Sequence, residues 1–522
     1  MHSFRMITPI ALALCLSWVG CDSNDPVTPD TFPFNPDTLD FDQIQSLDYG
    51  DYVQPLLAYR NVFDVDEAEP SDRLDDYSWS ALFTGSNASG ATVIPFNADE
   101  SLLVRCAEGN CVAPAGTVPI PYPNVSALQE DEVAYLRRWV EDGAKDDNGQ
   151  VPFADAEVLL YVCNQMANRV AIVDGERMQV IRYVDMMDLG EGMMTKPHHT
   201  AVEPDGSAWY LNLIVGDGGT PGGSILKLST DLTMDPSDPA YVIAREMPPE
   251  GEETFQKPGM MALDSTSNWL FSGRSFAADP TSTGIARVDR TTMEFEEIPT
   301  IGVNHPHAIG VSTNGKWVLS ASLDLDNTIN VIDTVTGDLV DQLLVAGSTL
   351  AFVQFAASPD GTTVVVTSQV GGKLLFLQIN PDTGELTENG EVAVGDEPWH
   401  PVFSPDGSTI YVPNRISHNV SVVDVATQTV TATIGNPDGG EAVFSEPHGS
   451  AITADGSVLF IANRNLNFGL WTPPYPTLDE DGEPLPNTEF GNVVVVDTAT
   501  NEVMSVIQMG KWASGMSIYD PR

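Results

Sequence analysis

The feature that most constrains the fold of this chain is a short turn that recurs at a nearly constant interval. Asp-Gly and Asn-Gly pairs favour tight hairpin turns. They stand at Asp205-Gly206, Asn314-Gly315, Asp360-Gly361, Asp406-Gly407 and Asp455-Gly456. The last four of these glycines are separated by 46, 46 and 49 residues, and a degenerate copy, LDSTSNWLFSGR, fits between the first two turns. A fixed period of this length is typical of a repeat architecture.

Each repeat contains the pattern of four short strands. The unit FSPDGSTIYVPNRISHNVSVVDVATQTVTATI has an apolar strand, the Asp-Gly turn, and then three segments that alternate or are rich in β-branched residues. Units of this kind predict a β-propeller with seven blades over residues 157–522. The repeat region begins at LLYVCNQ, which matches a second strand, and ends at ASGMSIYD, which matches a first strand. We therefore expect the last strand to complete the first blade and close the ring.

Three short sequences within the repeats match a known type of β-propeller repeat. The phrases SPDG, YVPN and VSVVDVATQTV resemble the YVTN-type β-propeller repeat. This resemblance implies a seven-bladed propeller but no particular activity.

Residues 46–150 have the pattern of a small helical domain. Its clearest helix is SALQEDEVAYLRRWVEDGA, which Ser126 is expected to cap, with Gln129 completing a capping box and Gly143 ending the helix. One face of it is apolar, formed by Val133, Leu136, Trp139 and Val140. The predicted fold class is therefore mainly β, a seven-bladed propeller with a small N-terminal α-helical domain.

The order VQPLLAYR, PSDRLDDYSWSALFTG, DESLLVR and the last helix resembles bacterial c-type cytochrome domains. The C-x-x-C-H motif of that family is absent, since Asn61-Val62-Phe63-Asp64-Val65 stands in its place. No His or Met lies between Cys21 and Met166, so no covalent haem c is expected. The resemblance implies a haem-less cytochrome c-like domain that is structural or serves docking.

The N-terminus has the features of an export signal. An apolar run, Ile7 to Val19, follows Arg5, and residues 1–20 are interpreted as a signal peptide. The sequence Trp18-Val19-Gly20-Cys21 resembles a bacterial lipoprotein signal, which implies lipidation at Cys21; a simple secretory signal with an incidental Cys is the alternative.

Residues 21–45 are expected to form an acidic, Pro-rich tether. The predicted location is the cell envelope, lipid-anchored to a membrane and either periplasmic or on the cell surface. In that oxidising setting Cys106 and Cys111 are expected to pair.

Composition narrows the range of partners. The chain has 74 Asp and Glu but only 23 Lys and Arg, a formal net charge of −51. Because binding to nucleic acid requires cations that neutralise phosphate, no nucleic-acid partner is expected. With 42% hydrophobic residues the chain can still fold, so the acidity predicts a strongly hydrated surface of halophilic type.

The histidines fall at equivalent positions of different repeats. Three stand eight residues before the turn glycine and two stand seven before it: His198, His307 and His448, then His199 and His400. Each should open the innermost strand of its blade, so four blades should direct imidazoles at one channel mouth. His305 lies in the loop that leads to this mouth, and His418 lies between a second and a third strand.

Several neutral imidazoles around one axis suit a transition metal, chiefly copper or zinc. The PHH and EPH phrases resemble the propeller domain of nitrous oxide reductases, where histidines hold a copper–sulfide cluster. Only four blades carry such a His in this chain, which favours one ion over a cluster. The alternative is that each His hydrogen-bonds a neighbouring blade and stabilises the ring.

Arginines form a second candidate site. Arg274, Arg415 and Arg464 follow the second strands of their units and could bind an anionic ligand together with His305 and His418; local charge balance is the alternative. No catalytic residue is identified, and no Walker loop, dinucleotide fingerprint or nucleophile elbow is present.

Two function classes follow. The first is an envelope lipoprotein whose propeller binds a metal, a small ligand, a glycan or a protein. The second is a redox copper enzyme or electron-transfer protein related to nitrous oxide reductase.

Overall fold

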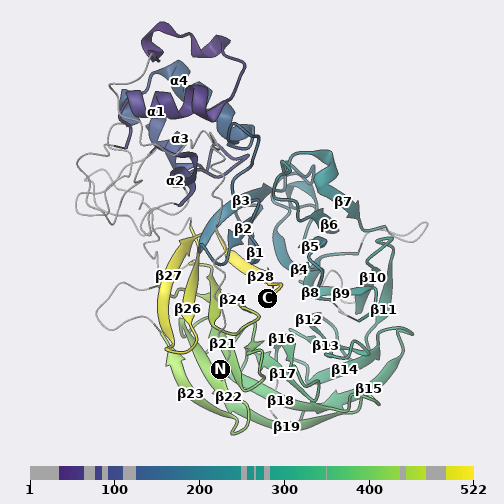
Figure 1. Cartoon of the computed structure of the whole chain (residues 1–522). Coiled ribbons are helices and arrows are strands. Elements are labelled where there is room, and N and C mark those ends of the chain that lie inside the picture. The colour runs from purple at the N-terminus through teal and green to yellow at the C-terminus, as the bar shows by residue number, and fades with distance from the viewer. Residues whose placement is uncertain are drawn as a thin grey trace, which may run out of the picture.

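The computed structural model describes a seven-bladed β-propeller with a helical region beside it (Figure 1). The predicted fold class is confirmed. The described residues are 34–63, 77–84, 92–109, 125–247, 255–263, 266–275, 283–347, 350–435, 443–465 and 490–522. No described helix has the length and apolar character needed to cross a membrane.

Each blade is a four-stranded antiparallel sheet that runs from an inner strand at the axis to an outer strand. In that order, the first three blades are β28 (Ala513–Tyr519), β1 (Leu159–Asn164), β2 (Arg169–Asp174) and β3 (Gln179–Asp185); then β4 (Pro197–Val202), β5 (Ala208–Leu213), β6 (Ser224–Ser229) and β7 (Val242–Arg245); then β8 (Pro258–Leu263), β9 (Trp269–Arg274), β10 (Gly284–Asp289) and β11 (Phe295–Pro299).

The remaining four blades follow in chain order. They are β12 (Pro306–Val311), β13 (Trp317–Ser322), β14 (Thr328–Asp333) and β15 (Leu339–Leu344); then β16 (Phe352–Ala357), β17 (Thr363–Ser368), β18 (Lys373–Ile379) and β19 (Leu386–Ala393); then β20 (Val402–Phe403), β21 (Thr409–Asn414), β22 (Asn419–Asp424) and β23 (Thr429–Ile434); and β24 (Pro447–Ile452), β25 (Val458–Asn463), β26 (Asn492–Asp497) and β27 (Glu502–Gln508).

The ring closes as the sequence predicts. The C-terminal strand β28 pairs antiparallel with β1, in a register that places Tyr519 opposite Leu159. It thereby provides the inner strand of the first blade and leaves no gap between the first and the last repeat. The predicted hairpin turns between inner and second strands are present, and their glycines adopt the left-handed conformation, with φ between 70° and 74° at Gly206, Gly315, Gly361, Gly407 and Gly456.

The core of the propeller lies between neighbouring blades. Phe376 and Leu374 of the fifth blade, for example, belong to one buried cluster with Phe403, Ile410 and Val412 of the sixth. Both faces of each sheet are covered in this way, which explains why second strands such as β1 are buried at every position. A ring packed on this principle is a rigid scaffold for the residues at its axis.

The helical region contains short helices before one longer helix. They are η2 (Pro36–Thr38), η3 (Phe41–Gln43), η4 (Tyr49–Val53), α1 (Gln54–Tyr59), α2 (Trp79–Thr84), α3 (Leu102–Ala107), η5 (Val125–Ala127) and α4 (Glu130–Glu141). The last helix begins later than the sequence pattern predicts, because Gln129 itself is the N-cap and its N–H donates to Glu132 at 2.8 Å. Ser126 lies in η5 instead. The predicted stop is correct, since Gly143 has a φ of +102°.

The described part of the predicted tether is packed rather than extended. Phe41 is fully buried, with its ring centre 5.2 Å from that of Tyr135. The helical region therefore begins before the boundary at residue 45, because an aromatic side chain there completes its core. The signal segment and Cys21 lie outside the described residues. Cys106 is disulfide-bonded, and its predicted partner, Cys111, also lies outside them.

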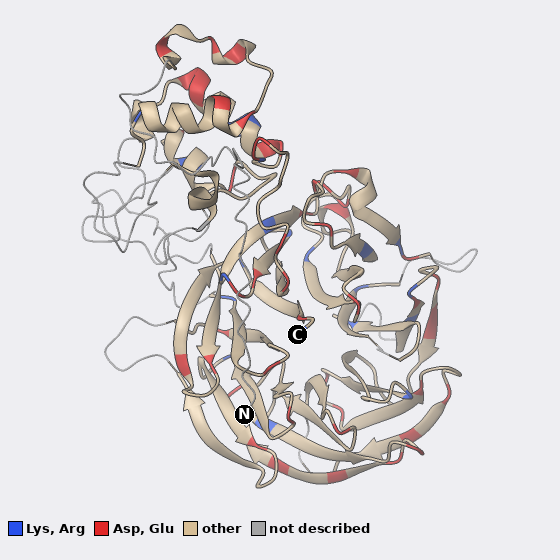
Figure 2. Ribbon diagram, viewed as in Figure 1, with Lys and Arg blue, Asp and Glu red and all other residues tan. Residues whose placement is uncertain are grey.

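The helical region is attached to the first blade (Figure 1). Gln179 of β3 donates to the carbonyl oxygen of Phe83 at 2.8 Å, and Arg169 of β2 pairs with Glu100 at 2.5 Å. Acidic residues are distributed over the helices, the outer strands and the blade turns, with few basic residues among them (Figure 2). The acidity is thus spread over the molecule rather than gathered in one segment.

Candidate functional site

Six histidines from four blades meet at the axis of the propeller. His198 and His199 stand at the start of β4, His307 at the start of β12 and His448 at the start of β24, while His400 precedes β20 by two residues. These are inner strands, as the sequence predicts. We call His198, His199, His305, His307, His400 and His448 the His cluster.

Ring contacts connect the members of the cluster across blades. The ring centres of His400 and His448 lie 4.5 Å apart, those of His199 and His400 lie 5.7 Å apart, and those of His198 and His307 lie 6.0 Å apart. His305 joins through His307 at 6.1 Å. These contacts form two groups of three imidazoles. Trp399 links the groups, since its ring centre lies 6.4 Å from that of His307 and 5.7 Å from that of His400.

Hydrogen bonds fix the tautomers of two rings. His307 Nδ1 donates to the carbonyl oxygen of Val353 at 2.9 Å, which leaves its Nε2 as the unprotonated nitrogen. His448 Nε2 accepts from Arg464 Nη2 at 2.7 Å, because a guanidinium can only donate. His198 Nδ1 lies 3.3 Å from Gln165 Nε2. Such partners orient an imidazole in the way that hydrogen-bonding groups behind the ligands do in metal sites.

Burial keeps five rings of the cluster neutral. Desolvation lowers the pKa of His307 to about 3 and that of His199 to about 4. It also lowers the pKa of His198, His400 and His448 well below the usual range, and the neighbouring imidazoles and Arg464 lower them further. At neutral pH these rings are lone-pair donors and hydrogen-bond groups rather than cations.

Several ring nitrogens in the cluster are buried and make no hydrogen bond to any described residue: His198 Nε2, His199 Nδ1, His305 Nε2, His400 Nε2 and His448 Nδ1. Within the described ranges, no three His, Cys, Asp or Glu side chains are arranged around one point as ligands of an ion. The rings are thus adjacent, but their nitrogens do not converge in the conformation seen.

The three candidate arginines have different surroundings. Arg274 donates to the carbonyl oxygens of Gly284 and Gln256 and pairs with Glu297 at 2.7 Å. Arg415 pairs with Glu397. Each of these two is thus paired with a carboxylate, as the charge-balance alternative expects, and the Arg415 guanidinium carbon also lies 5.5 Å from the centre of the Trp399 ring. Arg464 instead contacts the His cluster through His448.

His305 and His418 also differ. His305 belongs to the cluster, and its Nδ1 lies 3.5 Å from Asp324 Oδ1. His418 sits in the hairpin between β21 and β22, where its Nδ1 accepts from the backbone N–H of Glu446 at 3.0 Å. Of the predicted ligand-binding residues, the structure thus brings His305 and Arg464 to the cluster.

Sequence reasoning missed the aromatic residues of the site. Trp399 lies 4.1 Å from His448 and 5.7 Å from His400 between ring centres, and the Arg464 guanidinium carbon lies 5.0 Å from the centre of the Trp399 ring and 4.8 Å from that of Trp512. Both tryptophans directly precede the start of an inner strand or its His, in EPWHP and KWASG. Aligning tryptophans as well as histidines on the repeats would have found them.

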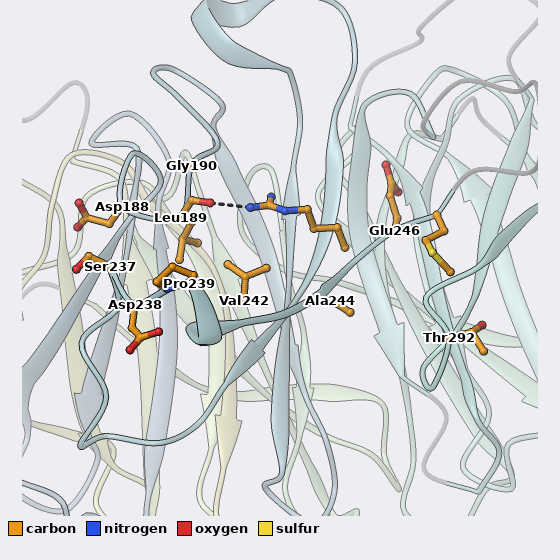
Figure 3. A pocket seen from close by; sticks show the side chains of 12 residues that line it. Asp188, Leu189, Gly190, Ser237, Asp238, Pro239, Val242, Ala244, Glu246 and Thr292 are labelled. Atoms are coloured by element: carbon orange, nitrogen blue, oxygen red, sulfur yellow. Dashed lines mark hydrogen bonds between the residues drawn. The ribbon is translucent and has the colours of Figure 1, made fainter.

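A pocket of about 650 Å³ lies elsewhere, beside the outer strand β7 (Figure 3). Arg245 in this pocket donates to the carbonyl oxygen of Leu189 at 2.7 Å. The Glu246 carboxylate is buried there without a hydrogen bond to any described side chain, and burial raises its pKa well above the usual range. Two of its lining residues, Glu246 and Met247, directly precede residues 248–254 in the sequence, which lie outside the described ranges, and we assign the pocket no role.

Comparisons with known proteins agree with the fold. The profile of the family described as "Lactonase, 7-bladed beta-propeller" matches residues 247–467, which is less than half of the chain. Among solved structures, one assigned as a 6-phosphogluconolactonase from Bacteroides fragilis superposes with a TM-score of 0.50 at 15% identity, over 71% of this chain and 100% of that one. Identity this low supports the fold alone.

Two further similarities involve hydrazine synthase of Kuenenia stuttgartiensis. Its β subunit is 41% identical over 56 residues, which is 11% of this chain and 13% of the relative's length. The solved hydrazine synthase covers 61% of this chain and 88% of its own, with 16% identity and a TM-score of 0.44. By its sheet topology the chain is a seven-bladed β-propeller, and over residues 247–467 it is similar to the lactonase family.

Proposed function

We propose that this protein is a cell-envelope lipoprotein whose propeller binds one transition-metal ion, copper or zinc, at the His cluster. The observation that carries the proposal is the burial of neutral imidazoles from four blades with ring nitrogens that lack hydrogen-bond partners among the described residues. Copper and zinc both accept imidazole nitrogen as a ligand.

Ring separations in the cluster suit a shared ion. Two imidazoles bound to one ion at about 2.0 Å have ring centres about 4.5 to 6.3 Å apart, from a right-angled to a linear arrangement. The His199–His400 and His198–His307 pairs, at 5.7 and 6.0 Å, fall in this range. A single ion would require these rings to rotate until their nitrogens point to one position.

The members of the predicted ligand set are not equivalent. His448 gives its unprotonated nitrogen to Arg464, so it contributes a hydrogen bond rather than a metal bond in this conformation. His307 uses Nδ1 for its hydrogen bond to Val353, so its Nε2 keeps an available lone pair. His199 and His400 each have a buried ring nitrogen that makes no hydrogen bond to a described residue. We therefore expect His198, His199, His307 and His400 to provide the ligands.

The test is elemental analysis of protein purified without chelator and then loaded with Cu²⁺ or Zn²⁺. Wild type is expected to retain about one ion per chain, and the H199Q/H400Q double variant is expected to retain much less. The matched control is H418Q, because His418 lies outside the cluster. If wild type retains no more metal than the double variant at equal folding by circular dichroism, the metal proposal is wrong.

Copper-loaded protein also tests the redox alternative. A copper enzyme or electron-transfer protein related to nitrous oxide reductase would show visible absorption that changes reversibly with reductant. A colourless or redox-inert copper complex would support binding alone.

Lactone hydrolysis is a second candidate, favoured by the family match over residues 247–467. That segment contains His305, His307, His400, His448 and Arg464. A neutral imidazole can act as a general base toward water. The test is the rate of glucono-1,5-lactone hydrolysis in the presence of wild type, measured with and without added metal. A rate equal to that in buffer alone would count against this candidate.

The proposed location rests on the lipoprotein signal at Cys21 and on the acidic composition. The helical region, a haem-less cytochrome c-like module in this proposal, would then hold the propeller near the membrane and serve docking. A C21A variant expressed in its host should move from the membrane fraction to the soluble fraction. Persistence in the membrane fraction would contradict the lipid anchor.

A further inference from the structure

Arg464 is a buried cation without a carboxylate partner among the described residues. It directly follows β25, and only 7% of the residue is exposed. Within the described ranges its guanidinium has one polar contact, with His448, and it lies between the rings of Trp399 and Trp512. Arg274 and Arg415, which stand at the end of β9 and directly after β21, both pair with glutamates. A lone buried cation is unusual in a chain with 74 acidic residues.

The groups around Arg464 are hydrogen-bond donors without acceptors. Since His448 Nε2 accepts from Arg464, its proton must be on Nδ1. That Nδ1–H is buried and makes no hydrogen bond to a described residue, and the same holds for Arg464 Nε–H and for the indole N–H groups of Trp399 and Trp512. Buried donors in folded proteins are normally satisfied. These unpaired donors surround one cation. They therefore suit a ligand that only accepts hydrogen bonds.

We propose that Arg464, His448, Trp399 and Trp512 form a binding site for a small monoanionic carboxylate ligand. One unpaired positive charge matches one negative charge, and a carboxylate has acceptor sites for both the guanidinium and the N–H donors. The indole rings give an apolar wall for the organic part of the ligand.

The surroundings favour a monoanion over a dianion. The neighbouring imidazoles are neutral, and within the described ranges Arg464 is the one cation that hydrogen-bonds a ring of the His cluster. Burial lowers the pKa of Arg464 to about 9, which still leaves the guanidinium protonated at neutral pH. Arg415, the next cation, is neutralised by Glu397. A phosphate dianion would bury an additional negative charge without a partner.

This site does not depend on the metal proposal. The donor groups are defined by Arg464, His448 and the two tryptophans, whereas the expected metal ligands are His198, His199, His307 and His400. The H199Q variant, which removes one expected metal ligand, should therefore keep the carboxylate site.

The test is calorimetric titration of metal-free protein with acetate, with benzoate and with inorganic phosphate at constant ionic strength and pH 7.5. Wild type is expected to bind benzoate saturably and more tightly than acetate, and to bind phosphate weakly or not at all. R464Q should weaken carboxylate binding about 10- to 100-fold, and R464K should weaken it less, since the charge remains but the planar fork is lost.

The matched control is R274Q, because Arg274 stands at the end of the second strand of the third blade, is also buried and is paired with Glu297. This variant should bind benzoate like wild type. H199Q, which removes one expected metal ligand whose ring contacts neither His448 nor Trp399 in the described structure, should do the same, so failure of the metal proposal leaves this result unchanged. The inference is overturned if wild type shows no saturable carboxylate binding, whether or not the Arg464 variants fold. It is also overturned if R464Q binds as tightly as wild type, or if phosphate binds more tightly than both carboxylates.

Discussion

Acid should weaken the propeller through its buried imidazoles, and His307 allows the size of the effect to be worked out. Its ring is 2% exposed, its Nδ1 donates to Val353, and its pKa is lowered to about 3. In the unfolded chain the pKa is about 6.5. As the pH falls, the unfolded chain takes up the proton first, so stability at this site is present above pH 6.5 and is lost progressively down to the folded-state pKa.

The expected magnitude follows from the difference between the two states. Each pH unit below 6.5 costs about 1.4 kcal/mol, so at pH 5 the burial of a neutral His307 costs about 2 kcal/mol relative to neutral pH. Carboxylates also titrate in this range, but they are shared by wild type and an H307Q variant and cancel in the difference. Gln is suitable because its amide can still donate to Val353.

The assay is urea unfolding of wild type and H307Q at pH 7.5 and at pH 5. The stability of wild type relative to H307Q should fall by about 2 kcal/mol between the two pH values. H418Q serves as a control, because the His418 ring is only half-buried and should give a smaller change. If the difference between wild type and H307Q is the same at both pH values, His307 is protonated as easily in the folded protein as in the unfolded chain, and the reasoning about a neutral cluster is wrong.

Two further predictions concern the scaffold. Removal of residues 513–522 takes away β28, which pairs with β1 and closes the ring. Cooperative thermal unfolding, followed by circular dichroism, should then be lost. Removal of Pro521 and Arg522 alone should change the melting temperature little. In the helical region, E132A should lower the free energy of unfolding in a urea titration by about 3 kcal/mol or more, because Glu132 is buried and paired with Arg60 at 2.6 Å. D99N, which affects the exposed pair with Arg137, should lower it by less than about 1 kcal/mol.

The ring and the meeting of the histidines could be predicted because both follow from local register. A hairpin turn fixes which residue begins each inner strand, and repetition of the turn then places His198, His307 and His448 at equivalent points around the axis. No long-range information is needed beyond closure of the ring. The packing of Phe41 could not be predicted for the opposite reason, since its burial depends on Tyr135, far along the chain.

The different roles of the three arginines could not be predicted. Arg274, Arg415 and Arg464 look alike in sequence, because each stands at the end of a second strand or directly after it. What separates them is whether a carboxylate from another segment reaches the guanidinium, as Glu297 of β11 reaches Arg274. For Arg464 that place is taken by aromatic rings from two other segments, and only the assembled ring brings Trp399 and Trp512 to one side chain.

The net charge of −51 should make the two proposed ligands respond to salt in opposite ways. The long-range field of the acidic surface attracts a metal cation and repels a carboxylate, and salt screens this field over about 10 Å at 0.1 M. The contacts at Arg464 are buried and are screened much less. Raising the NaCl concentration from about 0.05 to about 0.5 M should therefore weaken binding of Zn²⁺ to the His cluster and strengthen binding of benzoate at Arg464, both measured by calorimetry. Weaker benzoate binding at high salt would mean that the carboxylate is held by exposed cations, and Arg464 would then not be its site.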